Sequence, residues 1–410
     1  MPKNSIRGTE VPHSPIRSLL PHAEAAKAQG KHIYHLNIGQ PDIVTPPEAL
    51  AAVRSDVGMI VGYGPSEGIP ALRKAVARYY ERYDAGLSPA DVYVTTGASE
   101  AILFALFACC DAGDEVIIPE PFYANYLGFA QMSAVQVVPL TTRLETGFGL
   151  PGPDAFEQLI TSRTKAIFLC NPGNPTGQLY DRGDLEKLAE LAMRHDLYLI
   201  VDEVYREFCY DRPFTSVLSL REAAEHVVVI DSISKVFSSC GARVGYLITK
   251  NSQLRRIVDK YAQLRLSPPY FGQRLAEACY RHSEAYIAEA KAEYNRRRWV
   301  LFEGLSRMEG VQCYLPGAAF YNMVELPVAD AAHFCQWLLT DFDLDGQTVM
   351  LAPADGFYFH KVLGRRQVRI AYILNENDLG RALSCLREAL RQYGLIFGQP
   401  VPGENLALVH

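Results

Sequence analysis

The chain has 410 residues, enough for two domains that each bury a sizeable core. Its apolar fraction of 49% and charged fraction of 21% are those of an ordinary globular protein, and a formal net charge of -6 argues against a nucleic-acid partner or an anionic membrane surface. No apolar run approaches the length of a membrane span, and residues 1–21 lack the apolar core of a signal peptide. We therefore expect a cytoplasmic protein.

Nine cysteines are present without any CxxC spacing, and several of them lie inside apolar runs. Buried, reduced thiols explain such a distribution better than a disulfide framework or a metal site. We expect neither disulfides nor a bound metal.

The predicted elements begin with a helix over residues 16–29, a short strand in the stretch 35–47 and a helix over 69–83. From residue 90 to residue 250, strand-like apolar runs alternate with helix-like segments at 99–110 and 184–195. The apolar runs cover residues 92–95, 115–118, 135–140, 166–170, 198–201, 227–230 and 244–248. This alternation predicts an α/β domain with a mainly parallel seven-stranded sheet covered by helices.

The remainder of the chain predicts a smaller α+β domain. It starts with a long charged helix over residues 284–308. Strands are then predicted at 311–315, 320–325, 348–351 and 367–371, and helices at 331–339 and 376–393. We expect a large domain over residues 46–288, and a small domain over residues 1–45 and 289–410 that includes an N-terminal arm.

Polar residues follow four of the apolar runs where each predicted strand ends. They are Gly97-Ala98-Ser99, the loop 171–177, the stretch 202–205 and the stretch 231–235. Ligands of open α/β sheets bind beyond the carboxyl ends of the strands, and polar side chains are costly to bury without a partner. Four such endings favour a single polar pocket.

Lys235 stands between the apolar runs 226–230 and 244–248, among small hydroxyl residues. A lysine removed from water has a lowered pKa, which suits it to forming a Schiff base with an aldehyde. Arg243, eight positions further on, offers a planar fork for a phosphate. Taken alone, the stretch 232–243 fits a surface loop better than a cofactor site. The polar residues at the other strand ends favour the pocket.

Three motifs follow one another in this chain: NPGNPTG at 171–177, DEVY at 202–205, and SISK at 232–235 followed by Arg243. In this order they resemble the class I/II aminotransferases, pyridoxal-phosphate enzymes of the aspartate aminotransferase fold. The resemblance extends from about Leu36 to about Leu390. It implies transfer of an amino group between an L-amino acid, with acidic or aromatic ones favoured, and a 2-oxo acid such as 2-oxoglutarate.

The resemblance also assigns roles around the cofactor ring. It implies Lys235 as the lysine that binds the cofactor aldehyde and moves a proton, and Asp202 as the carboxylate that faces the pyridine nitrogen. Tyr205 and Asn174 match donors to the phenolic oxygen, and Tyr123 matches the aromatic residue stacked on the ring. From the residues alone, Asp202 also fits a helix cap, Asn174 a turn, and the two tyrosines structural packing.

The cofactor phosphate is expected at Gly97-Ala98-Ser99, where a helix start offers N–H groups and a favourable dipole. The resemblance adds a hydroxyl from Ser232 and a charge-assisted pair from Arg243. A plain capped helix start is the alternative for residues 97–99.

For the substrate, the resemblance implies Arg369 as the residue that grips the α-carboxylate, with Gly39 and Asn174 close to it. Tyr63 matches the tyrosine that reaches the phosphate of a neighbouring subunit, which implies a symmetric homodimer with shared active sites. A turn glycine and a surface tyrosine are the alternatives for residues 39 and 63.

The chain departs from the family pattern on the substrate side. In the motif usually written Pro-x-Gly-Ala-Phe-Tyr, Ala318 replaces the glycine. Arg265 falls where some relatives place a residue for a distal substrate carboxylate, although an ordinary helix-end arginine is the stronger interpretation. The preferred amino donor therefore stays open.

Two other functions are compatible with the motifs. The same fold and lysine serve elimination or replacement enzymes that resemble aminocyclopropane-carboxylate synthase and act on S-adenosylmethionine. A non-catalytic regulator of this fold is the second alternative, but the negative net charge and the start of the resemblance near Leu36 argue against a DNA-binding partner domain.

Overall fold

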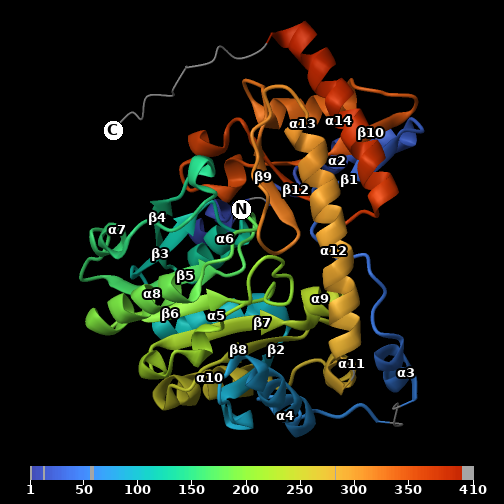
Figure 1. Cartoon of the computed structure of the whole chain (residues 1–410). Helices are drawn as coiled ribbons and strands as arrows, with labels where there is room; N and C mark the ends of the chain where they lie inside the picture. Colours follow the sequence, from blue (N-terminus) through green and yellow to red (C-terminus); the bar gives the residue numbers. More distant parts are fainter. Residues whose placement is uncertain (1, 13, 56–59, 282, 399–410) are drawn as a thin grey trace. The chain divides into compact units, whose positions relative to one another are not determined.

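The computed structural model describes residues 2–12, 14–55, 60–281 and 283–398 (Figure 1). Contacts divide the chain into two compact units. The first consists of the described parts of Met1–Pro12 and Gln40–Tyr294, with Gly317–Ala319. The second consists of the described parts of His13–Gly39 and Phe320–His410, with Asn295–Pro316. The domain boundaries expected from the sequence stay predictions.

The α-helices are α1 (Ile6–Glu10), α2 (Leu20–Ala28), α3 (Pro47–Ser55), α4 (Pro70–Tyr79), α5 (Gly97–Cys109), α6 (Asn125–Met132), α7 (Pro153–Glu157), α8 (Arg182–Arg194), α9 (Ile233–Val236), α10 (Ser252–Arg265), α11 (Tyr270–Arg281), α12 (Ser283–Ser306), α13 (Ala331–Thr340) and α14 (Glu376–Phe397). The strands are β1 (His32–His35), β2 (Val92–Thr95), β3 (Glu115–Glu120), β4 (Gln136–Thr141), β5 (Thr164–Cys170), β6 (Tyr198–Asp202), β7 (Val227–Ser232), β8 (Gly245–Ile248), β9 (Tyr321–Glu325), β10 (Gln347–Met350), β11 (Ala352–Pro353) and β12 (Gln367–Ala371). Within the described ranges, no helix combines the length and apolar character needed to cross a bilayer.

The first unit contains a seven-stranded sheet in the order β2-β8-β7-β6-β5-β3-β4. Strand β8 runs antiparallel to both of its neighbours, and the other neighbouring strands are parallel. The predicted α/β fold with a mainly parallel seven-stranded sheet is therefore confirmed. Each strand lies within two residues of its predicted position at either end, because the apolar runs mark the buried strands directly.

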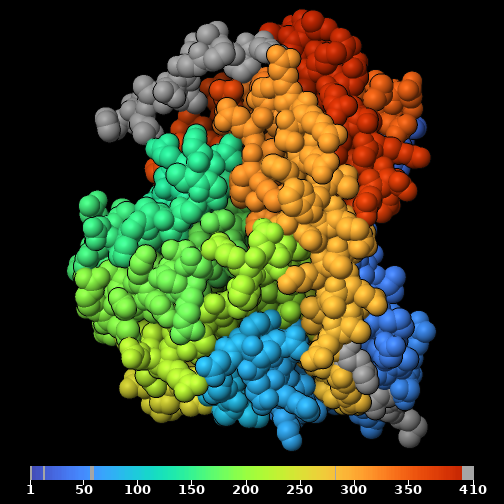
Figure 2. All heavy atoms as spheres, viewed as in Figure 1, coloured from blue at the N-terminus to red at the C-terminus, as the bar shows by residue number. Residues whose placement is uncertain are grey.

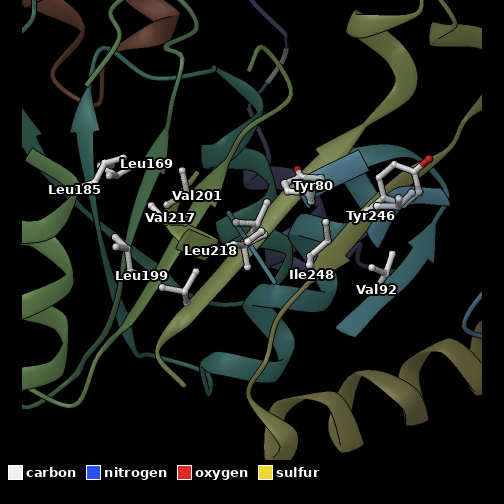
Figure 3. Packing of buried hydrophobic residues seen from close by; sticks show 14 of the residues in the cluster. Tyr80, Val92, Leu169, Leu185, Leu199, Val201, Val217, Leu218, Tyr246 and Ile248 are labelled. Carbon is white, nitrogen blue, oxygen red and sulfur yellow. The ribbon is translucent and has the colours of Figure 1, made fainter. Parts of the chain in front are cut away.

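The two faces of this sheet carry separate apolar clusters, because successive strand side chains point to opposite faces. On one face, Leu199 and Val201 of β6 share a cluster with Leu185 of α8 (Figure 3). On the other face, Ile200 belongs to a cluster with residues of α5, α6 and α10. Each fully buried aliphatic side chain stabilises the fold by roughly 1.5–3 kcal/mol. Helices on both faces thus hold the strand ends of β5, β6 and β7 in place.

Helix α8 shows how local sequence sets the helix boundaries. The Asp181 carboxylate accepts a hydrogen bond from the Asp184 N–H at 3.0 Å, and the Asp184 carboxylate accepts one from the Asp181 N–H at 3.3 Å. This reciprocal cap satisfies amides that a helix start leaves without partners. Leu185, Leu188 and Leu191 then lie buried on one face. The predicted helix over 184–195 is confirmed within two residues.

Helix α4 lies on the surface of the first unit (light blue in Figures 1 and 2). It buries Leu72 and Val76 and leaves Arg78 exposed. The predicted helix over 69–83 is shorter in the structure, because the chain tightens into a 3-10 turn over Tyr80–Tyr83 after α4 ends.

The second unit has a three-stranded antiparallel sheet in the order β11-β12-β9 and a parallel pair of β1 with β10. Helices α13 and α14 pack on β10, and α2 packs on α13. The register places Arg369 of β12 opposite Met323 of β9 and Ala352 of β11. Arg369 therefore lies on the central strand of this small sheet.

Two predictions about this part of the chain were wrong. Residues 311–315 form no regular strand, and a single bridge between Gln312 and Glu325 joins them to β9. Pro316 follows this segment and has no backbone N–H to donate, so strand pairing cannot continue through it. The first strand ends at His35 rather than extending beyond it, because its pairing with β10 covers His32–His35. In the first unit, helices α1, α3, α6, α7, α9 and α11 were not predicted from the sequence, and for α10 only a helix end at Arg265 was indicated.

A buried ion pair connects the segment after β6 to the end of β7. The Arg206 guanidinium donates to the Asp231 carboxylate, and both side chains are fully buried. The Tyr80 hydroxyl donates to the other Asp231 oxygen at 3.0 Å, and the guanidinium also lies over the rings of Tyr79 and Tyr80. Removing one partner of such a pair leaves an uncompensated buried charge.

We therefore predict that Arg206→Met lowers the free energy of unfolding by about 3–5 kcal/mol, as measured by denaturant titration. The matched control is Arg182→Met on α8, whose pair with Glu186 is 60% and 46% exposed and should contribute less than about 1 kcal/mol. Equal losses from both variants would contradict the prediction.

Candidate active site

The polar strand ends predicted from the sequence meet at one edge of the seven-stranded sheet. Strands β5, β6 and β7 are parallel neighbours, and Cys170, Asp202 and Ile230 lie side by side in their registers. Residues that follow these positions therefore emerge at the same carboxyl edge. That edge carries the loop 171–177, Asp202 and the turn into α9.

Asp202, the last residue of β6, is a buried carboxylate with two donors. The Tyr126 hydroxyl donates to Oδ2 at 2.8 Å, and the Val204 N–H donates to Oδ1 at 3.2 Å. Burial raises the Asp202 pKa to about 6, although these donors and the positive charge of Lys235 lower it. A further cationic N–H partner would stabilise the ionised form.

Lys235 lies in the short helix α9, whose start is capped by the Ser232 hydroxyl accepting from the Ser234 N–H at 3.3 Å. Its Nζ donates to Cys240 Sγ at 3.9 Å. The neighbouring Ser234 and Val236 are buried, whereas Lys235 is half-buried, so it is less enclosed than the sequence predicted. Its amine is thus held at the sheet edge and remains reachable.

Asn174 and Tyr205 are buried together at this edge. The Asn174 amide donates to the Tyr205 hydroxyl at 3.5 Å. Tyr123 is half-buried, whereas the adjacent Phe122 is 2% exposed in the core. The aromatic ring available at the sheet edge is therefore that of Tyr123, and its hydroxyl accepts from Asn125 at 2.8 Å.

The start of α5 forms a tight cradle with the segment after α9. Gly97 has a φ of +73°, and a Cβ at this position would lie 2.4 Å from an Arg243 guanidinium nitrogen. A Cβ at Gly245 would lie 2.4 Å from the Ala98 nitrogen. Only glycine permits both approaches. The amides of Gly97, Ala98 and Ser99 and the Arg243 guanidinium are therefore concentrated at one place.

These groups fit pyridoxal phosphate. A cradle of helix amides with a guanidinium suits a phosphate, and a buried carboxylate suits a pyridine N–H. A lysine amine suits an aldehyde, and the Tyr205 hydroxyl with the Asn174 amide suits a phenolic oxygen.

Arg369 and Gly39 belong to the second unit. Arg369 is 1% exposed, and its guanidinium donates to the Asn37 carbonyl at 2.5 Å and lies 4.5 Å from the centre of the Tyr321 ring. A Cβ at Gly39 would lie 1.7 Å from the Tyr321 hydroxyl, so only glycine fits there. Residues Gly39, Tyr321 and Arg369 thus form one compact group.

Two further residues that the family pattern brought into question, Tyr63 and Arg265, belong to the first unit. Tyr63 is 83% exposed on the first unit. Arg265 donates to Glu100 at 2.6 Å and to the Ser66 carbonyl at 2.8 Å, so it is held inside the first unit. The Ala318 side chain that replaces the family's glycine is buried in an apolar cluster with Leu179 and Cys209.

Sequence reasoning missed Tyr126 and Glu100. Tyr126 lies in the PFYANY stretch that supplied Tyr123, and Glu100 directly follows the cradle residues. The sequence did contain a signal for Tyr126: it is a second tyrosine three positions after Tyr123, at the start of a helix that follows a strand end. Its contact with Asp202 joins residues 76 positions apart and requires the fold to be known.

Comparisons with known proteins agree with this site. The family model "Aminotransferase class I and II" matches residues 31–386. The aspartate/prephenate aminotransferase of Thermus thermophilus is 32% identical over 365 residues, which cover 87% of this chain and 91% of that protein. The crystal structure of aspartate aminotransferase from Thermotoga maritima matches with a TM-score of 0.87 at 31% identity, over 95% of this chain and 100% of that one.

Another similar structure is the alanine aminotransferase of Pyrococcus furiosus, with a TM-score of 0.88 at 28% identity, covering 95% of this chain and 100% of that one. Together the motifs, the sheet and these matches identify the protein: it belongs to the class I and II aminotransferases, which depend on pyridoxal phosphate.

Proposed function

We propose that this aminotransferase moves the amino group of an acidic or aromatic L-amino acid to a 2-oxo acid such as 2-oxoglutarate. The observation that carries the proposal is the convergence of Asp202, Asn174, Tyr205 and Lys235 at one sheet edge. Relatives named aspartate and aspartate/prephenate aminotransferase support the substrate class.

Five side chains are proposed to act on the cofactor ring and its carbonyl carbon. When bound, pyridoxal phosphate supplies a carbonyl carbon that combines with amines and a ring that withdraws electrons. Lys235 would hold that carbon, and once the substrate amine has replaced it there, the freed lysine amine would carry the proton removed from the substrate Cα. Asp202 keeps a proton on the ring nitrogen, and the Tyr205 hydroxyl and Asn174 amide donate to the phenolic oxygen. Tyr123 packs against the ring face.

The remaining proposed contacts position the phosphate and the substrate. Gly97, Ala98 and Ser99 offer helix amides to the phosphate, while Ser232 and Arg243 add a hydroxyl and a positive charge. Arg369 is proposed to bind the substrate α-carboxylate with both arms of its guanidinium, with Gly39 of the same unit beside it, and Asn174 is proposed as a further substrate contact. The contact of Arg369 with the Asn37 carbonyl and its placement over two aromatic rings hold the guanidinium in a fixed orientation.

We further propose a cytoplasmic homodimer. Large apolar side chains are exposed on two segments of the first unit: Ile60, Val61 and Tyr63, and Leu264, Leu266 and Phe271. The bond from Arg265 to the Ser66 carbonyl brings these segments together. An exposed apolar patch of this kind is typical of a subunit interface, and Tyr63 on it is proposed to reach the phosphate in the partner subunit.

A half-reaction screen tests the proposed reaction. The holoenzyme is mixed separately with aspartate, glutamate, tyrosine, phenylalanine, alanine, lysine and S-adenosylmethionine, and the cofactor absorbance and 2-oxo acid product are recorded. We expect acidic or aromatic amino acids to convert the cofactor to its pyridoxamine form, and 2-oxoglutarate to reverse the conversion. Consumption of S-adenosylmethionine without that form would instead support an elimination or replacement enzyme.

A second test concerns the Tyr126–Asp202 hydrogen bond. Because burial sets the Asp202 pKa to about 6, we expect the affinity of the cofactor-free protein for pyridoxal phosphate to fall as the pH is lowered through about 6. Tyr126→Phe removes a donor that favours the carboxylate, which raises the Asp202 pKa further. The midpoint of this fall, the pH at which half of the affinity for pyridoxal phosphate is lost, should therefore rise by about one pH unit.

The matched control for this test is Tyr93→Phe, because the Tyr93 hydroxyl donates to the Arg255 carbonyl rather than to Asp202. Its midpoint should equal that of the unmodified protein. An unchanged or lowered midpoint in Tyr126→Phe would refute the proposed role of Tyr126.

A further inference from the structure

Arg265, the last residue of α10, is tied to three separate segments around the proposed phosphate cradle. Its Nη1 donates to Glu100 Oε2 at 2.6 Å. Its Nη2 donates to the Ser66 carbonyl at 2.8 Å and to the Val94 carbonyl at 3.3 Å. The Arg265 and Glu100 side chains are only 15% and 18% exposed. Arg265 is therefore built into the fold and is not a solvated helix-end residue.

Glu100 lies in the first turn of α5, one residue after the cradle amides. Its Oε2 accepts the Thr96 N–H at 2.8 Å, so this carboxylate fixes the residue that precedes Gly97. A carboxylate at a helix start is favourable for the helix itself. It is unfavourable for a phosphate bound at the same amides, because two negative charges then share a poorly hydrated site.

We propose that Arg265 is a positioning residue for the cofactor phosphate, which neutralises Glu100 so that Glu100 can anchor Thr96 without repelling the phosphate. This role rests on the proposed phosphate cradle at residues 97–99. It also accounts for the two carbonyl contacts of Arg265, which hold strand β2 and the loop that carries Tyr63 in register with the cradle.

The same contacts argue against Arg265 as a receptor for a distal substrate carboxylate. Its Nη1 is committed to Glu100 and its Nη2 to two backbone carbonyls. A substrate would have to displace a short ion pair that is mostly buried, and the displaced Glu100 would be left without its cation. The positive charge of Arg265 is thus paired with Glu100 within the first unit.

The experiment compares the affinity of the cofactor-free protein for pyridoxal phosphate and for pyridoxal, which lacks the phosphate, by absorbance titration. We expect Arg265→Met to weaken pyridoxal phosphate binding about tenfold or more and to leave pyridoxal binding nearly unchanged. The double variant Arg265→Met/Glu100→Gln should recover most of the loss, because it removes the unpaired carboxylate. Inorganic phosphate should compete about tenfold less well in Arg265→Met than in the double variant.

The matched control is Arg255→Met, which breaks the Arg255–Asp91 pair at the other end of α10. It should leave the preference for pyridoxal phosphate over pyridoxal unchanged. If Arg265→Met does not fold, Glu100→Gln alone provides the test: it keeps an acceptor for Thr96, and its affinity for pyridoxal phosphate should stay equal or rise.

Equal weakening of both ligands in Arg265→Met, no recovery in the double variant, or a loss of affinity in Glu100→Gln would overturn the inference. If the unmodified protein itself binds pyridoxal as tightly as pyridoxal phosphate, the proposed cradle fails instead. The two failures are therefore distinguishable.

Discussion

The ionised state of one buried carboxylate, that of Asp202, is the constraint on which the rest of the active site depends. Burial at the end of β6 raises its pKa to about 6, and an unpaired buried charge is costly. The Tyr126 hydroxyl and the Val204 amide each donate to it, and the charge of Lys235 favours it. A cofactor with a protonated nitrogen adds a third donor to the carboxylate. The free energy of this interaction then offsets the cost of burying the ionised carboxylate.

Two other buried carboxylates near the ends of these strands, those of Glu203 and Asp231, are stabilised by different partners. Glu203 points to the opposite face of the sheet, where burial raises its pKa to about 8 while Ser216 and the Val217 amide donate to it. Asp231 is compensated by the buried Arg206. The negative charge of Asp231 raises the pKa of Asp202, so the Arg206 pair influences the site without touching it. Helix packing on both sheet faces keeps water away from all three carboxylates.

Much of the fold could be predicted from the sequence, because buried parallel strands are continuous apolar runs and polar residues mark where they end. The edge that carries Asp202 and Lys235 was predicted in this way. Contacts between segments far apart could not be predicted: Tyr126 reaches Asp202 across 76 positions, and Arg265 reaches Glu100 across 165. The local sequence marks Tyr126 only as a second tyrosine close to Tyr123, and it does not indicate which distant residue Tyr126 or Arg265 contacts. The strand predicted over residues 311–315 was wrong because the apolar run is present but has no continuous neighbouring strand to pair with. A single bridge therefore forms in place of a ladder of hydrogen bonds.

The most direct test of the central claim is to reduce the holoenzyme with borohydride, digest it and locate the bound cofactor by mass spectrometry. The account predicts that the reduced cofactor is attached to the peptide containing Lys235, and that Lys235→Ala carries none. Attachment to any other lysine, or no covalent attachment in the unmodified holoenzyme, would contradict it.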